Sequence, residues 1–175
     1  MSVLKNAKNG RTLPPVRDGD INDCETRVCA RLRAFWGDLS SRVGGIPRTT
    51  EFELMDIYDI ADRVVLKDVV DGGRDFRNRF WGTYLVQSFD IEWTRLLVSD
   101  YQPVGLRDLV LQMNRAVLEK RAPICHRARI KHLESRDFLS YEVLHVPFRA
   151  AEGEEIAQIL SAYDFDVVVA ESAGG

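Results

Sequence analysis

The chain has 175 residues, of which 45% are hydrophobic, and this balance predicts one globular domain with short extensions. With 24 basic and 27 acidic residues the net charge is −3, so no overall field attracts nucleic acid or an anionic membrane, and neither is expected as a partner. No apolar run reaches the roughly 18 residues of a membrane span, and the polar start lacks the apolar stretch of a secretion signal. We therefore expect a soluble, cytoplasmic protein, whose three cysteines without a CxxC pair are buried thiols: Cys24, Cys29 and Cys125.

Residues 1–20 are polar and contain glycines and prolines, which predicts a flexible arm. From Asn22 apolar residues recur at helical spacing, and Gly44-Gly45 supplies a stop, so an amphipathic helix is predicted within 21–45, with Asn22 and Glu25 as its capping box. An apolar stripe of this size is rarely left in water. We expect it to form a dimer or partner surface, with packing on the chain's own sheet as the alternative; the stripe consists of Val28, Leu32, Phe35, Trp36 and Leu39.

The next segment carries a β-hairpin pattern. Two strand-like runs, Val64–Val70 and Asp75–Trp81, flank the glycines of Asp71-Gly72-Gly73-Arg74. Helical patterns are predicted at 56–63, 83–89 and 106–121, and strands at 124–133, 138–148 and 156–164. Strands with helices inserted in one place indicate an α+β fold, with an antiparallel sheet and helices on one face.

The chain resembles a PAS domain and, more narrowly, a bacterial single-domain PAS-like family of unknown function. The resemblance rests on the hairpin sequence Asp-Gly-Gly-Arg-Asp-Phe-Arg, on Tyr141-Glu142 ahead of Pro147, and on the closing Asp164-Phe165-Asp166. It implies a five-stranded antiparallel sheet with its helices between the second and third strands, and a sensing or interaction module without an established reaction. On this basis residues 46–166 are expected to form the PAS-like domain and 167–175 a flexible tail.

If residues 134–137 form the loop between the strands predicted at 124–133 and 138–148, the pairing register of these two strands follows. Arg129 would then lie opposite Glu142, and His126 opposite His145. His126 and His132 would be about 20 Å apart along one strand, so no metal site is expected. Adjacent strand residues point to opposite faces, so Cys125 and His126 are not expected to form a nucleophile and base. The basic residues that alternate along this strand are expected to pair with acids such as Glu142 and not with nucleic acid.

A small-molecule pocket between sheet and helices is one interpretation of the aromatic and polar residues in this region. Its candidate lining is Phe76, Asn78, Phe80, Leu85, Phe89, His126, Ile130, Tyr141 and His145. The same residues would also serve a filled core, and Asn78 is the polar group that would mark a cavity. A flavin photosensor is disfavoured, because no cysteine that could react with the flavin lies in the helix after Thr83. Haem is also disfavoured, because only the sheet histidines offer an axial ligand. No cofactor is required by this interpretation.

Together these patterns predict a cytoplasmic sensory or regulatory module that associates with itself or with a signalling partner and is tuned by a small ligand. Catalysis is not expected, because no nucleophile is seen beside a base. Two alternatives stay open: an orphan structural domain with a filled core and, less favoured, a small hydrolase-type enzyme on a PAS-like scaffold.

Overall fold

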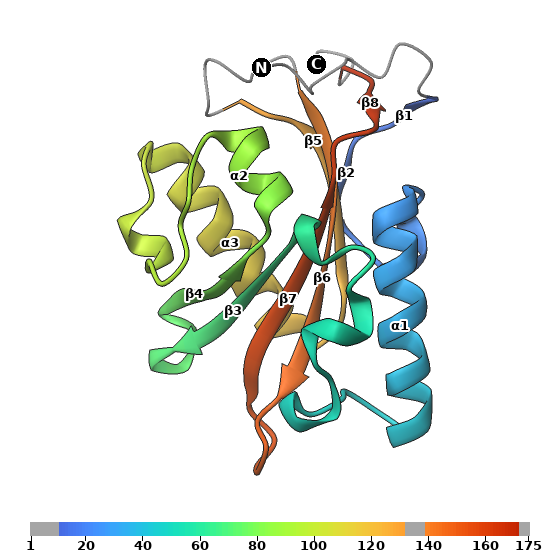
Figure 1. Cartoon of the computed structure of the whole chain (residues 1–175), viewed down its shortest axis with the longest axis vertical. Helices are drawn as coiled ribbons and strands as arrows, with labels where there is room; N and C mark the ends of the chain where they lie inside the picture. Colours follow the sequence, from blue (N-terminus) through green and yellow to red (C-terminus); the bar gives the residue numbers. More distant parts are fainter. Residues whose placement is uncertain (1–10, 132–138, 172–175) are drawn as a thin grey trace.

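A computed structural model of the chain describes residues 11–131 and 139–171 (Figure 1). The predicted arm residues 1–10, the predicted tail residues 172–175 and His132 lie outside this part. The described residues form a six-stranded antiparallel sheet with α1 on one face and α2 and α3 on the other. The α+β class and the antiparallel sheet are as predicted, and the two helices inserted between strands lie on one face, with α1 covering the other.

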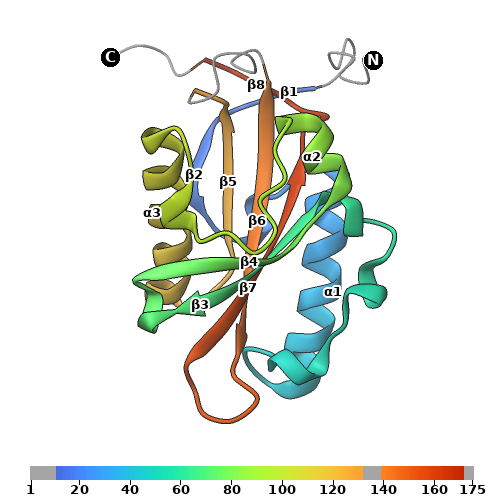
Figure 2. The same cartoon turned by 60° about the vertical axis from the view of Figure 1, so that its left-hand side comes forward.

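The strands are β1 Thr12–Leu13, β2 Val16–Gly19, β3 Val64–Val70, β4 Asp75–Trp81, β5 Ile124–Arg129, β6 Ser140–Arg149, β7 Ile156–Asp164 and β8 Val168–Val169. The α-helices are α1 Arg27–Val43, α2 Thr83–Phe89 and α3 Val104–Lys120. Two short 3-10 turns, Leu54–Ile57 and Ala61–Arg63, replace the helix predicted over 56–63. The main sheet has the order β2-β5-β6-β7-β3-β4. Figure 2 shows α3 alongside β2 and β5 at one edge of this sheet.

One face of the sheet, called the α1 face, is covered by the apolar stripe of α1. Four residues of the stripe are at most 8% exposed, and they pack against side chains of β6 and β7: Val28, Leu32, Trp36 and Leu39. The indole Nε1 of Trp36 donates a hydrogen bond of 2.9 Å to the carbonyl of Pro147, and the half-buried Phe35 packs on Phe52 with ring centroids 6.3 Å apart. The stripe is therefore used inside the chain. The prediction that Val28, Leu32, Phe35, Trp36 and Leu39 form a dimer or partner surface is wrong, because the sheet itself needed this cover.

The start of α1 is fixed by a carboxylate from the sheet. The Glu142 side chain on β6 accepts hydrogen bonds from the backbone amides of Glu25 and Thr26, at 3.0 and 2.8 Å. Arg127 on β5 donates to the same carboxylate at 2.8 and 2.6 Å, so the expected pairing with an acid is confirmed. The capping box predicted at Asn22 is wrong, because a buried ion pair distant in sequence supplies the acceptor and the helix begins only at Arg27.

Both described ends of the chain are paired with other strands. β2 forms an edge of the main sheet beside β5, and β1 pairs in parallel with β8. Leu13, Val167 and Val169 make a small apolar cluster. The predicted flexible arm over 1–20 and flexible tail over 167–175 are therefore wrong for these strands, because their partners are remote in sequence and local composition does not reveal them.

The predicted hairpin is confirmed in β3 and β4. Gly72 and Gly73 in its turn have φ angles of 65° and 95°, which side chains rarely adopt. A Cβ atom on Gly73 would also lie 2.4 Å from the Cδ1 atom of Leu118 on α3. Glycine at this position thus lets the hairpin approach α3 closely.

A β-bulge in β4 changes which side chains face which side. Lys67 pairs with Asn78, but the preceding residue of β3 pairs with Phe80, so Arg79 is the extra residue. Phe80 consequently packs on the α1 face and Trp81 on the opposite face, here called the α3 face. The prediction that Phe80 lines a pocket together with Asn78 is therefore wrong, because the bulge turns Phe80 to the α1 face.

The predicted register of β5 and β6 is wrong by two residues. Arg127, and not Arg129, lies opposite Glu142, and His126 does not lie opposite His145. The prediction depended on an assumed loop length. Because side chains alternate with a period of two, an error of two residues changes the partners but leaves every side chain on its predicted face.

Candidate functional site

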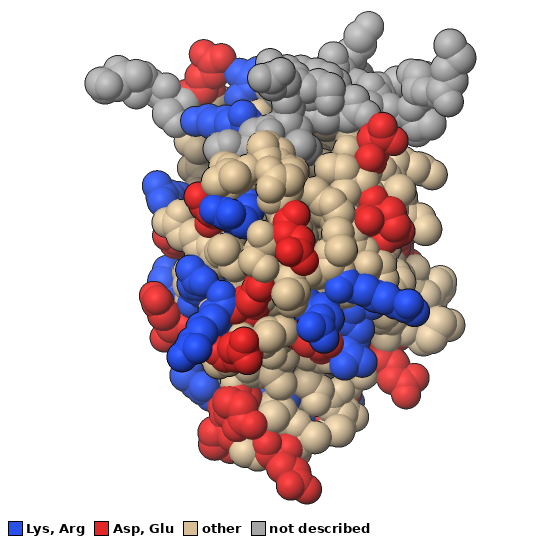
Figure 3. Space-filling model, turned by 90° about the vertical axis from the view of Figure 1, so that its left-hand side faces the viewer, with Lys and Arg blue, Asp and Glu red and all other residues tan. Residues whose placement is uncertain are grey.

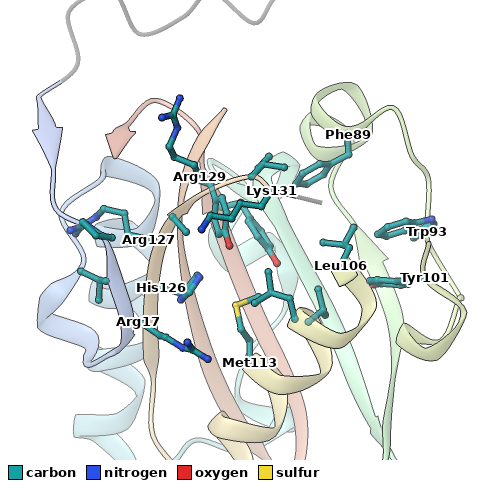
Figure 4. Close-up of a pocket in the computed structure, with 18 of the residues that line it drawn as sticks. Arg17, Phe89, Trp93, Tyr101, Leu106, Met113, His126, Arg127, Arg129 and Lys131 are labelled. Atoms are coloured by element: carbon teal, nitrogen blue, oxygen red, sulfur yellow. The ribbon is translucent and has the colours of Figure 1, made fainter. Parts of the chain in front are cut away.

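A cavity of about 490 Å³ lies on the α3 face of the sheet, a size typical of small-ligand sites (Figure 4). The strands contribute Pro15, Val16, Arg17, Lys67, Trp81, His126, Arg127, Ala128, Arg129, Ile130, Lys131, Tyr141 and Tyr163. The helical side contributes Phe89, Trp93, Tyr101, Leu106, Leu109, Val110 and Met113. In Figure 4, Arg17 of β2, His126 of β5 and Met113 of α3 lie in the same part of the cavity. This cavity argues against the alternative of a completely filled core.

Four of the nine predicted pocket residues line the cavity: Phe89, His126, Ile130 and Tyr141. The other five do not. Phe76 and Leu85 are fully buried in the apolar core on this face, and Phe80 lies on the α1 face because of the bulge. His145 and Asn78 are buried on the α3 face without lining the cavity. Sequence reasoning therefore identified the correct face of the sheet but not the wall of the cavity.

Asn78 does not line the cavity, but it supports the wall through hydrogen bonds to two lining residues. Its Nδ2 donates to the carbonyl of Trp93 at 2.9 Å, and the Tyr101 hydroxyl donates to its Oδ1 at 2.8 Å. The rings of Trp93 and Tyr101 stack with centroids 3.9 Å apart, and both line the cavity. Asn78 therefore acts indirectly, by fixing two aromatic side chains from the segment between α2 and α3.

Lys67 is the principal cavity residue that sequence reasoning missed. It lies in the middle of β3 and is 1% exposed, yet it lines the cavity. In residues 11–131 and 139–171 no hydrogen bond or ion pair reaches its amino group. Burial alone lowers the pKa of Lys67 from 10.5 to about 7. The alternation Val65, Lys67, Val69 was the available signal, since it places the lysine on the buried face with two valines.

Two histidines lie on the same face of the sheet as this lysine, and one of them, His145, is close to it. Burial lowers the pKa of His145 well below its usual value, and the positive charge of Lys67 lowers it further. Burial also lowers the pKa of His126. His126 Nδ1 and His145 Nε2 are buried without a hydrogen-bond partner among the described residues. Both rings are therefore uncharged at neutral pH, which leaves Lys67 as the buried titrating cation of this region.

One contact between a hydroxyl nucleophile and a base is present, which sequence reasoning did not find. His145 Nδ1 and the Ser161 hydroxyl are 2.6 Å apart. Ser161 is fully buried and His145 is 1% exposed, and neither lines the cavity. Among the described residues no carboxylate orients the imidazole. The contact satisfies two buried polar groups and gives no access to a substrate, so it does not favour a hydrolase.

Two tyrosines complete the polar part of the wall. Tyr141 and Tyr163 lie on neighbouring strands with ring centroids 6.3 Å apart, and His126 packs 5.8 Å from Tyr141. Burial raises the pKa of both phenols above the ordinary value, so the hydroxyls stay protonated and can donate hydrogen bonds. The aromatic cluster therefore offers hydrogen-bond donors beside an otherwise apolar wall.

The charged side chains that line the cavity are all basic. None of the described residues that line it is Asp or Glu, whereas five are Lys or Arg. Arg127 and Arg129 are paired, with Glu142 at 2.6 Å and with Glu171 at 2.7 Å. Three cations are left without an acidic partner among the described residues: the buried Lys67 and the exposed Arg17 and Lys131. A chain of net charge −3 thus carries a local concentration of positive charge at this cavity.

The cysteines lie apart from this chemistry. Cys24, Cys29 and Cys125 are free and at most 2% exposed, and they pack in the core of the α1 face. A hydrogen bond with Cys125 and burial raise the pKa of Cys24, and burial raises that of Cys29. These are inert structural thiols, as the sequence predicted.

The described part of the chain does not have the features of a metal site, a nucleic-acid-binding surface or a membrane-spanning helix. Within residues 11–131 and 139–171, no three His, Cys, Asp or Glu side chains gather as a metal site would require. On the surface that carries α2 and α3, basic and acidic side chains are interspersed instead of forming a basic stripe (Figure 3). No helix in the described ranges has the length and hydropathy needed to cross a bilayer.

Comparisons with known proteins returned no matching family model, no matching curated protein and no matching solved structure.

Proposed function

We propose that this chain is a PAS-like sensory or regulatory module whose cavity on the α3 face binds a small molecule. The connectivity supports the PAS assignment: five antiparallel strands, β3 to β7, with α2 and α3 inserted between the second and third of them. This is the arrangement that the resemblance of the hairpin sequence implied. The additional strand β2 and the covering helix α1 would be elaborations of that core.

The observation that carries the proposal is the cavity between the sheet and α3. Protein cores are ordinarily packed without voids of this size, so about 490 Å³ lined by fixed aromatic side chains indicates a place for a ligand. The Asn78 hydrogen bonds hold Trp93 and Tyr101 in place, so the site is largely formed before a ligand arrives. A preformed site loses little entropy on binding.

The output of such a module would be association with a second copy or with a signalling partner, in the cytoplasm. A bound ligand would contact α3, β3 and β5 at the same time. It would thereby alter the outer surface of the domain. Light scattering of the chain, with and without ligand, tests this part of the proposal. A mass that does not respond to ligand, together with no ligand-dependent partner, would refute output by association.

The ligand itself is tested by native mass spectrometry of the full chain purified from its own host. We expect a bound small molecule in the wild type and none in Ala128→Phe, which fills the cavity. Ala151→Phe, at an exposed turn position, is the matched control and should retain the ligand. If the wild type carries nothing and no compound in a broad thermal-shift screen stabilises it more than Ala128→Phe, the proposed function is wrong.

A further inference from the structure

We propose that the ligand of this cavity is an amphipathic monocarboxylate whose carboxylate pairs with Lys67 and whose apolar body lies against α3. This inference rests on the proposed function and names the chemical class of its ligand.

The position of Lys67 is the first argument. Its side chain is 1% exposed, lines the cavity and has no partner among the described residues. A buried amine without a partner is costly, and a buried cation is costlier still, unless an anion lies beside it. A carboxylate in the cavity supplies that anion. A neutral ligand would leave the ammonium unpaired, and a cationic ligand would be repelled.

The charge around the cavity is the second argument. Among the described lining residues no acid is present, and the cations Arg17 and Lys131 lie without an acidic partner. These exposed side chains attract an anion towards the cavity, whereas Lys67 binds it inside. One buried cation matches one negative charge. Further negative charges of a polyanion would have only the exposed Arg17 and Lys131 to pair with, and not a second unpaired buried cation among the described residues.

The neighbours of Lys67 are the third argument. His145 and Lys67 are close enough for the lysine charge to lower the histidine pKa. From His145 the rings of Tyr163, Tyr141 and His126 follow with successive centroid separations of 6.5, 6.3 and 5.8 Å. Tyr163, the first phenol of this series, can donate a hydrogen bond to a carboxylate beside Lys67, whereas Tyr141 and His126 lie farther along the wall and can donate to other polar groups of a ligand. All the polar groups of this wall can therefore serve as donors.

The remainder of the cavity requires an apolar ligand body. The side towards α3 presents Leu106, Leu109, Val110 and Met113, and the segment before α3 presents the stacked pair Trp93 and Tyr101. Contact with these surfaces supplies affinity through burial of apolar area, while the carboxylate sets orientation and selectivity. An alkyl chain or a single aromatic ring system satisfies both conditions.

The test uses two probe sets whose members differ in their headgroup: decanoate, 1-decanol and decylamine, and indole-3-acetate, tryptophol and tryptamine. Isothermal titration calorimetry at pH 7 on the full chain gives the dissociation constants. We expect the carboxylate of at least one set to bind about tenfold or more tightly than its alcohol, and the amine not to bind. Lys67→Met should bind acid and alcohol of that set within about twofold of each other. Arg42→Met removes an exposed charge on α1 and should behave as the wild type.

A second readout does not depend on a variant. Between pH 7 and 9 the carboxylate affinity of the wild type should fall by up to about tenfold per pH unit as Lys67 loses its proton, whereas alcohol affinity should stay constant. The facing groups His126 and His145 are already neutral there, and Tyr101, Tyr141 and Tyr163 remain protonated because burial raises their pKa values.

Several outcomes overturn the inference. An alcohol that binds as tightly as its acid, a carboxylate preference that survives in Lys67→Met, or a carboxylate affinity that does not change with pH would each do so. If no acid binds but mass spectrometry finds a neutral or cationic ligand that Ala128→Phe excludes, this inference fails and the proposed function stands. If nothing enters the cavity at all, both fail.

Discussion

Replacement of Lys67 by methionine should make the ligand-free protein more stable, by an amount that depends on pH. Burial lowers the pKa of this lysine from 10.5 to about 7 in the folded protein. At 1.36 kcal/mol per pH unit, that difference corresponds to a cost of the order of 5 kcal/mol for the folded state at pH 7 and below. Methionine has a similar length and no charge, so it removes this cost while it keeps the packing.

The direction of the pH dependence follows from proton counting. Below pH 7, Lys67 is protonated in both the folded and the unfolded state, so the full cost applies. Between pH 7 and 10.5 the unfolded state binds one more proton than the folded state, and the stability of the wild type therefore rises with pH relative to the variant. The advantage of Lys67→Met should shrink by roughly 2 kcal/mol between pH 7 and pH 9, because the folded-state lysine is already half deprotonated at pH 7.

Urea unfolding followed by circular dichroism at pH 7, 8 and 9 measures this difference directly. All other titrating groups are common to the two proteins, and His145, which senses Lys67, titrates below this range because its pKa is well below 6.5. Arg42→Met serves as the control for loss of an exposed charge. A stability difference between wild type and Lys67→Met that stays constant across the three pH values would refute the reasoning, since it would mean that Lys67 is not desolvated.

Arg127→Met should destabilise the fold by about 3 to 5 kcal/mol, measured by urea unfolding, because it leaves the buried Glu142 carboxylate without its cation; an unchanged midpoint would contradict the role of this pair at the start of α1. Trp36→Glu should lower the melting temperature without changing the mass seen by light scattering, because Trp36 packs on its own sheet; a change in oligomer mass in a fully folded variant would argue for an interface instead. Gly82→Ala should cost about 3 kcal/mol or more of unfolding free energy, because its Cβ would lie 2.1 Å from the Asp62 carbonyl oxygen; Gly37→Ala, with open space around it, is the matched control and should be neutral or stabilising.

Local signals in the sequence predicted the elements whose structure is decided locally. The β3–β4 hairpin depends on glycines at 72 and 73, where φ is positive, and both are visible in the sequence. α2 lies where the pattern placed it, and α3 ends one residue before the predicted Arg121. In each case the turn chemistry or the apolar period is contained within a few residues of the element itself.

Features decided by distant partners were not predictable in the same way. The chain segment of β2 is ordered by the edge of β5, more than 100 residues away, and nothing in its own composition indicates that edge. The bulge at Arg79 leaves no distinctive residue in the sequence, yet it moves Phe80 out of the cavity face and brings Trp81 in. A single inserted residue therefore changed the cavity wall more than the two-residue register error in β5 and β6 did.

Lys67 differs from these cases because the sequence did contain its signal. Val65 and Val69 flank it at strand spacing, so a lysine on the buried face was implied once the strand had been assigned. Interpreting it required the rule that a buried charge needs a partner, and the described residues supply none. The conflict between the strand pattern and the charge was thus the strongest indication of function in the chain.

Under the proposed function, the cost of Lys67 would also give the protein a physical means of responding to a ligand. A cost of the order of 5 kcal/mol is comparable to the whole stability of a typical domain, so the ligand-free protein is expected to be only marginally stable around β3. An anion that binds the folded state at a concentration 100 times its dissociation constant adds about 2.7 kcal/mol. Ligand binding would therefore stabilise the sheet. The surfaces of β3, β4 and α3 would then change their mobility together. A partner that recognises only the ordered surface would then report the presence of the acid without any enzymatic step.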